Sequence, residues 1–212
     1  MVTEPVSRRP SPAAVLTMTV AFGLLLGWAT YRLHGIAVLE RATNSVSTWI
    51  IWTAVAGALI PARRLAVWGG ALMMLATCGG YYTASTLGHT FGAGGLGTAA
   101  VWSAAGLAGG PLLAWAGWTV RRGRGDVVRP VAGAVIAMVV LGEALWLGLA
   151  LHYWGEAVVF LAVGVLLTAS LTACLARDGV HRYWLCALLA PVGGLAFCLA
   201  EKGVLDGLLG SV

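Results

Sequence analysis

The stretch that decides the fold is "PVAGAVIAMVVLGEALWLGLAL", residues 130–151, an apolar run that contains a single carboxylate, Glu143. A helix that crosses a bilayer needs about 20 consecutive, mostly apolar residues, and this run has that length. The rest of the chain has the same character, because 59% of its 212 residues are hydrophobic and only 10% are charged. Soluble domains carry about 25% charged residues. The sequence therefore predicts an all-α, multi-pass protein of the cell membrane.

Apolar runs of similar length recur along the chain and are separated by short, Arg-rich breaks such as "RRGRGDVVRP" (121–130) and "RDGVHR" (177–182). They predict a single transmembrane domain over residues 1–212, built as a bundle of seven transmembrane helices. The predicted helices are 13–33, 45–60, 65–86, 99–120, 130–151, 157–176 and 183–204.

The Lys and Arg residues predict how the bundle is oriented, because short cytoplasmic loops carry an excess of these residues. With seven helices and a cytoplasmic N-terminus, ten of the 13 basic residues lie inside and only Arg32, Arg41 and Lys202 lie outside. We therefore expect the N-terminus inside and the C-terminus outside. The basic balance of the chain then reports its topology, and we expect no nucleic-acid partner.

Several motifs that would indicate other chemistry are absent from the sequence. No two acids are spaced closely enough to hold magnesium on a diphosphate, and HExxH and GxSxG are missing. The four cysteines have no CxxC spacing and fall within apolar runs, so we interpret them as buried small hydrophobes. We expect no metal site and no cofactor.

Glu143 lies eight residues before the outer end of its predicted helix, which places it about 12 Å below that end. A carboxylate near the bilayer centre costs about 2.5–3.5 kcal/mol on insertion scales, so its side chain should face the bundle interior. Such an acid indicates a functional site, or else a structural hydrogen bond to a neighbouring helix. Both interpretations stay open at this point.

Aromatic and polar side chains gather in the outer half of the predicted bundle, at a depth similar to that of Glu143. They line a substrate pocket, or they form the aromatic belt that is common at membrane interfaces. Asn44, together with Ser45, could cap the second helix, and Asn44 could also hydrogen-bond a ligand. The candidate substrate-binding residues are Asn44, Trp49, Tyr81, Tyr82, Trp102, Trp146 and Glu156.

Three segments, "RATNSVSTWIIWTAVAGAL" (41–59), "GGYYTAST" (79–86) and "GEALW" (142–146), resemble a group of small multispan actinobacterial proteins of undefined function. In size, number of spans and isolated buried acids, the chain is also similar to the integral-membrane terpene cyclases of meroterpenoid and indole-terpenoid pathways. This second resemblance is architectural. It implies a metal-free enzyme that starts cyclisation by protonating an alkene or an epoxide with a carboxylic acid.

The residue types fit this chemistry, since apolar surroundings favour a neutral carboxylic acid and aromatic faces stabilise a carbocation. We expect Glu143 to be the general acid, and Glu201 or Glu40 to be a second carboxylate that orients it or accepts the final proton. The expected partners are the lipid bilayer, a lipophilic prenylated substrate and an upstream prenyltransferase. The alternatives are a small transporter, a substrate-binding subunit similar to the S-components of vitamin importers, or a non-catalytic assembly subunit.

Overall fold

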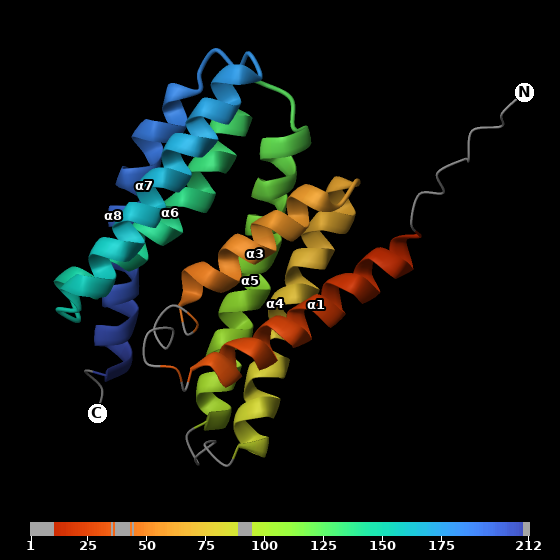
Figure 1. The fold of residues 1–212 in the computed structure, drawn as a ribbon, viewed down its shortest axis with the longest axis vertical. Coiled ribbons are helices and arrows are strands. Elements are labelled where there is room, and N and C mark those ends of the chain that lie inside the picture. Colours follow the sequence, from red (N-terminus) through yellow and green to blue (C-terminus); the bar gives the residue numbers. More distant parts are fainter. Residues whose placement is uncertain (1–10, 35, 37–42, 44, 89–94, 210–212) are drawn as a thin grey trace, which may run out of the picture.

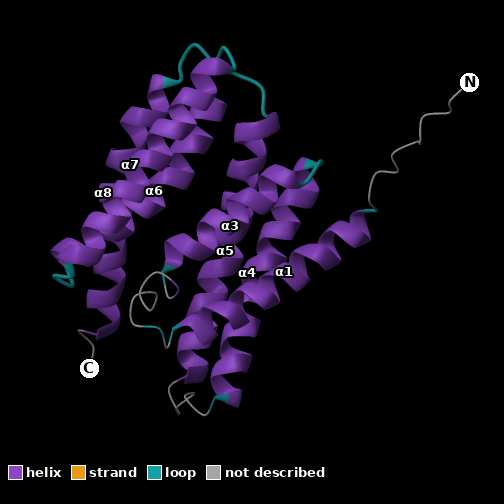
Figure 2. Cartoon of the chain, in the orientation of Figure 1, coloured by secondary structure: helices purple, strands orange, loops and turns teal. Residues whose placement is uncertain are grey.

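The computed structural model describes residues 11–34, 36, 43, 45–88 and 95–209, and their side chains up to residue 200. This part of the chain is helical, as Figure 2 shows, and contains seven helices whose bounds lie within a few residues of those predicted at most ends. The helices are α1 (Pro12–Leu33), α3 (Val46–Leu59), α4 (Arg63–Leu87), α5 (Gly95–Arg122), α6 (Val128–Leu149), α7 (Trp154–Arg177) and α8 (Trp184–Leu209) (Figure 1).

The helices form two groups that lie side by side (Figure 1). In the N-terminal group, α1 packs on α4, and α5 packs on both α3 and α4. In the C-terminal group, α6 packs between α7 and α8. The two groups meet where α6 contacts α5 and α3. Helix α6 therefore belongs to the core of the molecule, and its side chains are the ones best placed to join the groups.

Glycine allows the helices of the N-terminal group to approach closely. A Cβ atom on Gly27 of α1 would lie 1.9 Å from the carbonyl oxygen of Thr77 in α4, and one on Gly117 of α5 would lie 1.9 Å from the carbonyl oxygen of Ala54 in α3. Close packing of small residues is the usual basis of helix association in lipid, where no hydrophobic drive acts between helices. The many glycines of the sequence are thus explained in part by helix packing.

Four helices, α1, α5, α6 and α7, are long and apolar enough to cross a membrane, which indicates a membrane protein. Helix α3 is apolar but has only 14 residues, so it extends about 21 Å, less than the roughly 30 Å of a hydrocarbon core. Its N-terminal end is buried within the molecule, where Ser45 is 3% exposed and Ser47 is 1% exposed. The backbone N–H groups at that end therefore need partners within the protein.

The cysteine interpretation holds for three of the four residues. Cys78, Cys186 and Cys198 are buried and free, whereas Cys174 is exposed. The prediction of a buried position is wrong for Cys174, because it lies on α7, where only 11% of the spanning window is buried. Most of α7 forms the outer surface of the C-terminal group.

Candidate functional site

Glu143 lies in the interior of the molecule, as the sequence predicted. Its side chain is 9% exposed and projects from α6, the most buried of the spanning helices. Its Oε2 atom accepts two hydrogen bonds from the N-terminal end of α3, one from the Ser45 hydroxyl at 2.7 Å and one from the Ser47 backbone N–H at 2.8 Å. The acid therefore has partners on a neighbouring helix.

These two hydrogen bonds show that Glu143 caps helix α3. Ser45 is the N-cap residue of α3, and an N-cap side chain usually accepts a hydrogen bond from the second or third N–H group of its own helix. Here the Ser45 hydroxyl makes no such bond and donates to Glu143 instead, while Glu143 accepts the N–H of Ser47. A buried donor without a partner costs about 1–3 kcal/mol, so the acid removes a penalty that the buried start of α3 would otherwise carry.

The cap also joins the two helix groups, since α3 belongs to one group and α6 to the other. A small hydrophobic cluster of Ile50, Leu113 and Val139 supports the same junction and brings together α3, α5 and α6. Val139 lies one helical turn before Glu143, as expected for the same face of α6. The polar contact and the apolar cluster together hold the N-terminal half of α3 against α6.

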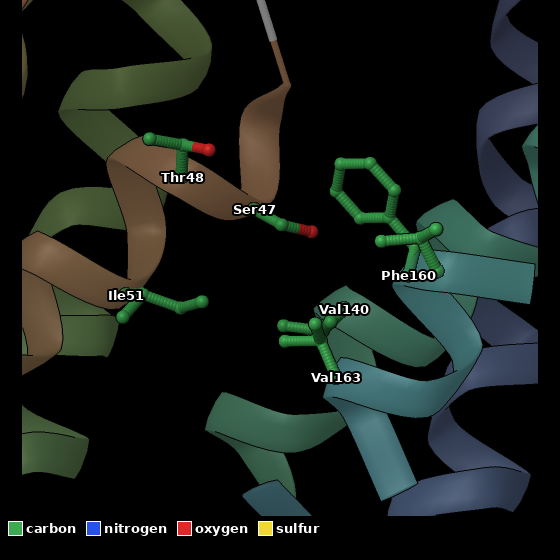
Figure 3. A pocket seen from close by; sticks show the side chains of 7 residues that line it. Ser47, Thr48, Ile51, Val140, Phe160 and Val163 are labelled. Atoms are coloured by element: carbon green, nitrogen blue, oxygen red, sulfur yellow. The ribbon is translucent and has the colours of Figure 1, made fainter. Parts of the chain in front are cut away.

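A cavity of about 170 Å³ lies next to this cap, between α3, α6 and α7 (Figure 3). Its lining is almost wholly apolar, and Ser47 contributes a hydroxyl group to it. Ser47 is 1% exposed, and within the described residues its Oγ atom has no hydrogen-bond partner. The lining residues are Ser47, Thr48, Ile51, Val140, Val159, Phe160 and Val163.

The cavity opens toward the outer surface of α7. Val159 and Val163, which line it from α7, are 60% and 42% exposed, whereas Val140, which lines it from α6, is fully buried. In a membrane-embedded protein, an opening on this apolar surface faces lipid. A lipophilic molecule could therefore enter the cavity sideways from the bilayer.

Three of the predicted substrate-binding aromatics lie together, on another side of α3 from Ser47. Trp49 packs edge-on against Tyr81, with ring centroids 5.8 Å apart, and Tyr81 packs in the same way against Tyr82 at 5.3 Å. Trp49 follows Ser47 by two residues, which places the two side chains on different sides of α3. Trp49 faces Met74 of α4, so this aromatic cluster does not line the cavity.

The remaining predicted residues are dispersed. Trp102 is 38% exposed on α5, Trp146 is half-buried on α6, and Glu156 is half-buried in the first turn of α7; none of these three lines the cavity. Asn44, Glu40 and the side chain of Glu201 lie outside the described part of the structure, so their roles stay predictions.

Ser47 is not among the residues predicted from the sequence, although it donates its N–H group to Glu143 and lines the cavity. The signal that could have found it is the small polar segment "TNSVS" (43–47), placed directly before a short apolar helix. A helix that begins inside the membrane needs polar groups at its start.

A model described as a family of unknown function, DUF6518, matches residues 6–205 of the chain. No curated protein and no solved structure matches the chain.

Proposed function

Since the chain belongs to DUF6518, a family of unknown function, we propose its function from the site itself. We propose that it is a membrane-embedded enzyme that binds a lipophilic prenylated substrate beside Glu143 and cyclises it without a metal ion. The observation that carries this proposal is the position of a buried acid next to an apolar cavity that opens toward lipid. Apolar sites with a few convergent polar groups are the usual form of small-molecule binding sites.

The proposed reaction uses Glu143 as the general acid. Oε2 accepts two hydrogen bonds, as the carbonyl oxygen of a neutral carboxylic acid can, which leaves Oε1 to carry the proton. Transfer of this proton to an alkene carbon or an epoxide oxygen creates an electron-poor carbon, and a second alkene of the substrate attacks that carbon to close the ring. Loss of one proton from the cyclised cation to a base restores the balance, so the reaction is an isomerisation.

We assign the second carboxylate, which would accept the final proton, to Glu201 or Glu40, as expected from the sequence. The aromatic cluster of Trp49, Tyr81 and Tyr82 lies on another side of α3. In this proposal, the aromatic ring beside the reacting carbon is therefore that of Phe160, which lines the cavity.

The proposal includes a topology of seven spans with the N-terminus inside and the C-terminus outside. It is supported by the alternating direction of successive helices in Figure 1, where the connections α3–α4, α5–α6 and α7–α8 share the upper end. These three connections carry or adjoin the Arg-rich breaks of the sequence. An excess of basic residues at one end favours the cytoplasmic side for that end.

The test compares Glu143→Gln with the native protein in membranes supplied with a farnesylated aromatic acceptor, with product analysis by mass spectrometry and NMR. Glutamine keeps a carbonyl oxygen for both hydrogen bonds from α3 but has no acidic proton. We expect a folded variant that forms no cyclised product. Unchanged cyclisation by Glu143→Gln would rule out the acid role. Asp126→Asn, the same carboxylate-to-amide change at an exposed position in the turn between α5 and α6, is the matched control.

A second candidate function is favoured by the location of the cavity at the junction of the two helix groups. A substrate-binding or transport subunit holds its ligand between groups of helices, and the cavity lies between α3 of one group and α6 and α7 of the other. Recovery of a bound lipophilic compound that is chemically unchanged after incubation would favour this function over cyclisation.

A further inference from the structure

We infer that the cavity between α3, α6 and α7 binds the oxygen-bearing end of a linear lipophilic molecule, with the Ser47 hydroxyl as its hydrogen-bonding group. The inference rests on the proposed function in placing the substrate in this cavity, but it does not depend on the chemistry of Glu143. The ligand class is a chain or isoprenoid whose inner end carries a hydroxyl, ether or carbonyl oxygen.

The size of the cavity limits what it can hold. Its volume of about 170 Å³ is close to that of an engineered 150 Å³ cavity that accommodates benzene, and is well below the roughly 300–1,000 Å³ of sites for drug-sized ligands. Only one end of a long molecule fits inside. The rest of the molecule must leave through the opening beside Val159 and Val163, where it would lie in the bilayer.

The Ser47 hydroxyl determines that the end of the ligand inside the cavity carries an oxygen atom. Buried hydroxyl groups are nearly always hydrogen-bonded, and each exception in a native protein needs an explanation. The Ser47 hydroxyl is such an exception within the described residues, because it is buried, has no partner and lines a cavity in which Thr48 is the one other polar residue. Figure 3 shows it pointing into the space between α3 and Phe160 of α7. An oxygen atom on the ligand would satisfy this group.

The Ser47 backbone supports the assignment by fixing where the hydroxyl lies. Its N–H group donates to Glu143 Oε2 at 2.8 Å, so the first turn of α3 is held in place by α6. A preorganised donor loses little entropy when a ligand binds. The hydroxyl is therefore part of a built site that has a fixed position relative to the apolar wall of Val140 and Phe160.

The test uses the full-length protein in lipid nanodiscs and two diazirine photoprobes, a ten-carbon alcohol and the matching hydrocarbon, with peptide mapping after irradiation. We expect the alcohol to label peptides of α3 and α7 beside the cavity and to compete with unlabelled decanol. Ser47→Ala should weaken this labelling about two- to tenfold, as expected for the loss of one hydrogen bond, and should leave labelling by the hydrocarbon unchanged.

A matched pair of variants on α7 separates the cavity from the lipid-facing surface. Val163→Trp, which fills the cavity, should abolish labelling by the alcohol, whereas Val165→Trp, at an exposed position outside the lining, should not.

Equal labelling by both probes, or no effect of Ser47→Ala in a folded variant, would overturn the inference. If Glu143→Gln loses cyclisation but is still labelled by the alcohol, both the binding site and the acid role of Glu143 are supported. If the native protein is labelled but forms no cyclised product, the proposed reaction is refuted and the binding site is not.

Discussion

The Oε2 atom of Glu143 accepts a hydrogen bond of 2.8 Å from the backbone N–H of Ser47, across 96 residues of sequence. This contact explains why a membrane helix carries an acid in its interior. Helix α3 begins at a buried position of the molecule, and α6 supplies an acceptor for the Ser47 N–H group there.

Two neighbouring glycines of α5 provide a matched test of the packing between α4 and α5. A Cβ on Gly110 would lie 2.5 Å from the carbonyl oxygen of Gly70, whereas no described atom lies within 4 Å of a Cβ on Gly109. We expect Gly110→Ala to lower the free energy of unfolding by about 1–3 kcal/mol, because the two backbones must move apart. Gly109→Ala should be neutral or stabilising by about 0.5–1 kcal/mol. Unfolding in mixed micelles measures both, and equal effects would contradict the packing described above.

Arg129 stabilises the end of the bundle that carries the Arg-rich breaks. Its Nε and NH2 groups donate to the carbonyl oxygen of Val120 at 3.0 and 2.8 Å, and its guanidinium pairs with Asp178. We expect Arg129→Gln to cost about 1.5–3 kcal/mol of unfolding free energy, since it removes charge-assisted bonds to the C-terminal end of α5. Asp178→Asn should cost no more than about 1 kcal/mol, because Asp178 is 48% exposed. Substitution of the exposed Arg124 by Gln is the control, and a larger effect for Asp178→Asn than for Arg129→Gln would refute this assignment.

The proposed topology predicts which turns are accessible from each side of the membrane. In a variant with the exposed Cys174 replaced by Ser, we expect Asp126→Cys, in the turn between α5 and α6, to react with an impermeant maleimide only after the membrane is opened. Leu151→Cys, in the turn between α6 and α7, should react in intact cells. The reverse pattern would invert the orientation, and reaction of both residues from one side would exclude a spanning α6.

The predicted fold needed only patterns that are local in the sequence. Runs of apolar residues and Arg-rich breaks determine where each helix begins and ends, and the depth of Glu143 in its own helix follows from counting residues. The partners of Glu143 could not be identified in this way. Ser45 and Ser47 are 98 and 96 residues away, and only the packing of α3 against α6 brings them together.

The same reason explains why the sequence could not show how the predicted aromatic residues lie relative to Glu143 and the cavity. Similar depth along different helices does not determine which face of each helix turns toward which neighbour. Only Thr48 separates Ser47 from Trp49, yet Ser47 faces Glu143 and the cavity, while Trp49 faces α4. The rotation of α3 about its axis depends on tertiary packing, and a single sequence does not reveal it.

The measurement that tests the capping role of Glu143 most directly is the free energy of unfolding of Glu143→Gln and Glu143→Leu, compared with the native protein in the same micelles. Glutamine keeps an acceptor for the Ser45 hydroxyl and the Ser47 N–H, so we expect it to lie within about 1 kcal/mol of the native value. Leucine leaves both donors buried without a partner and should lose at least about 2 kcal/mol. A native-like Glu143→Leu, or a Glu143→Gln as unstable as Glu143→Leu, would contradict the assignment of Glu143 as the cap of α3.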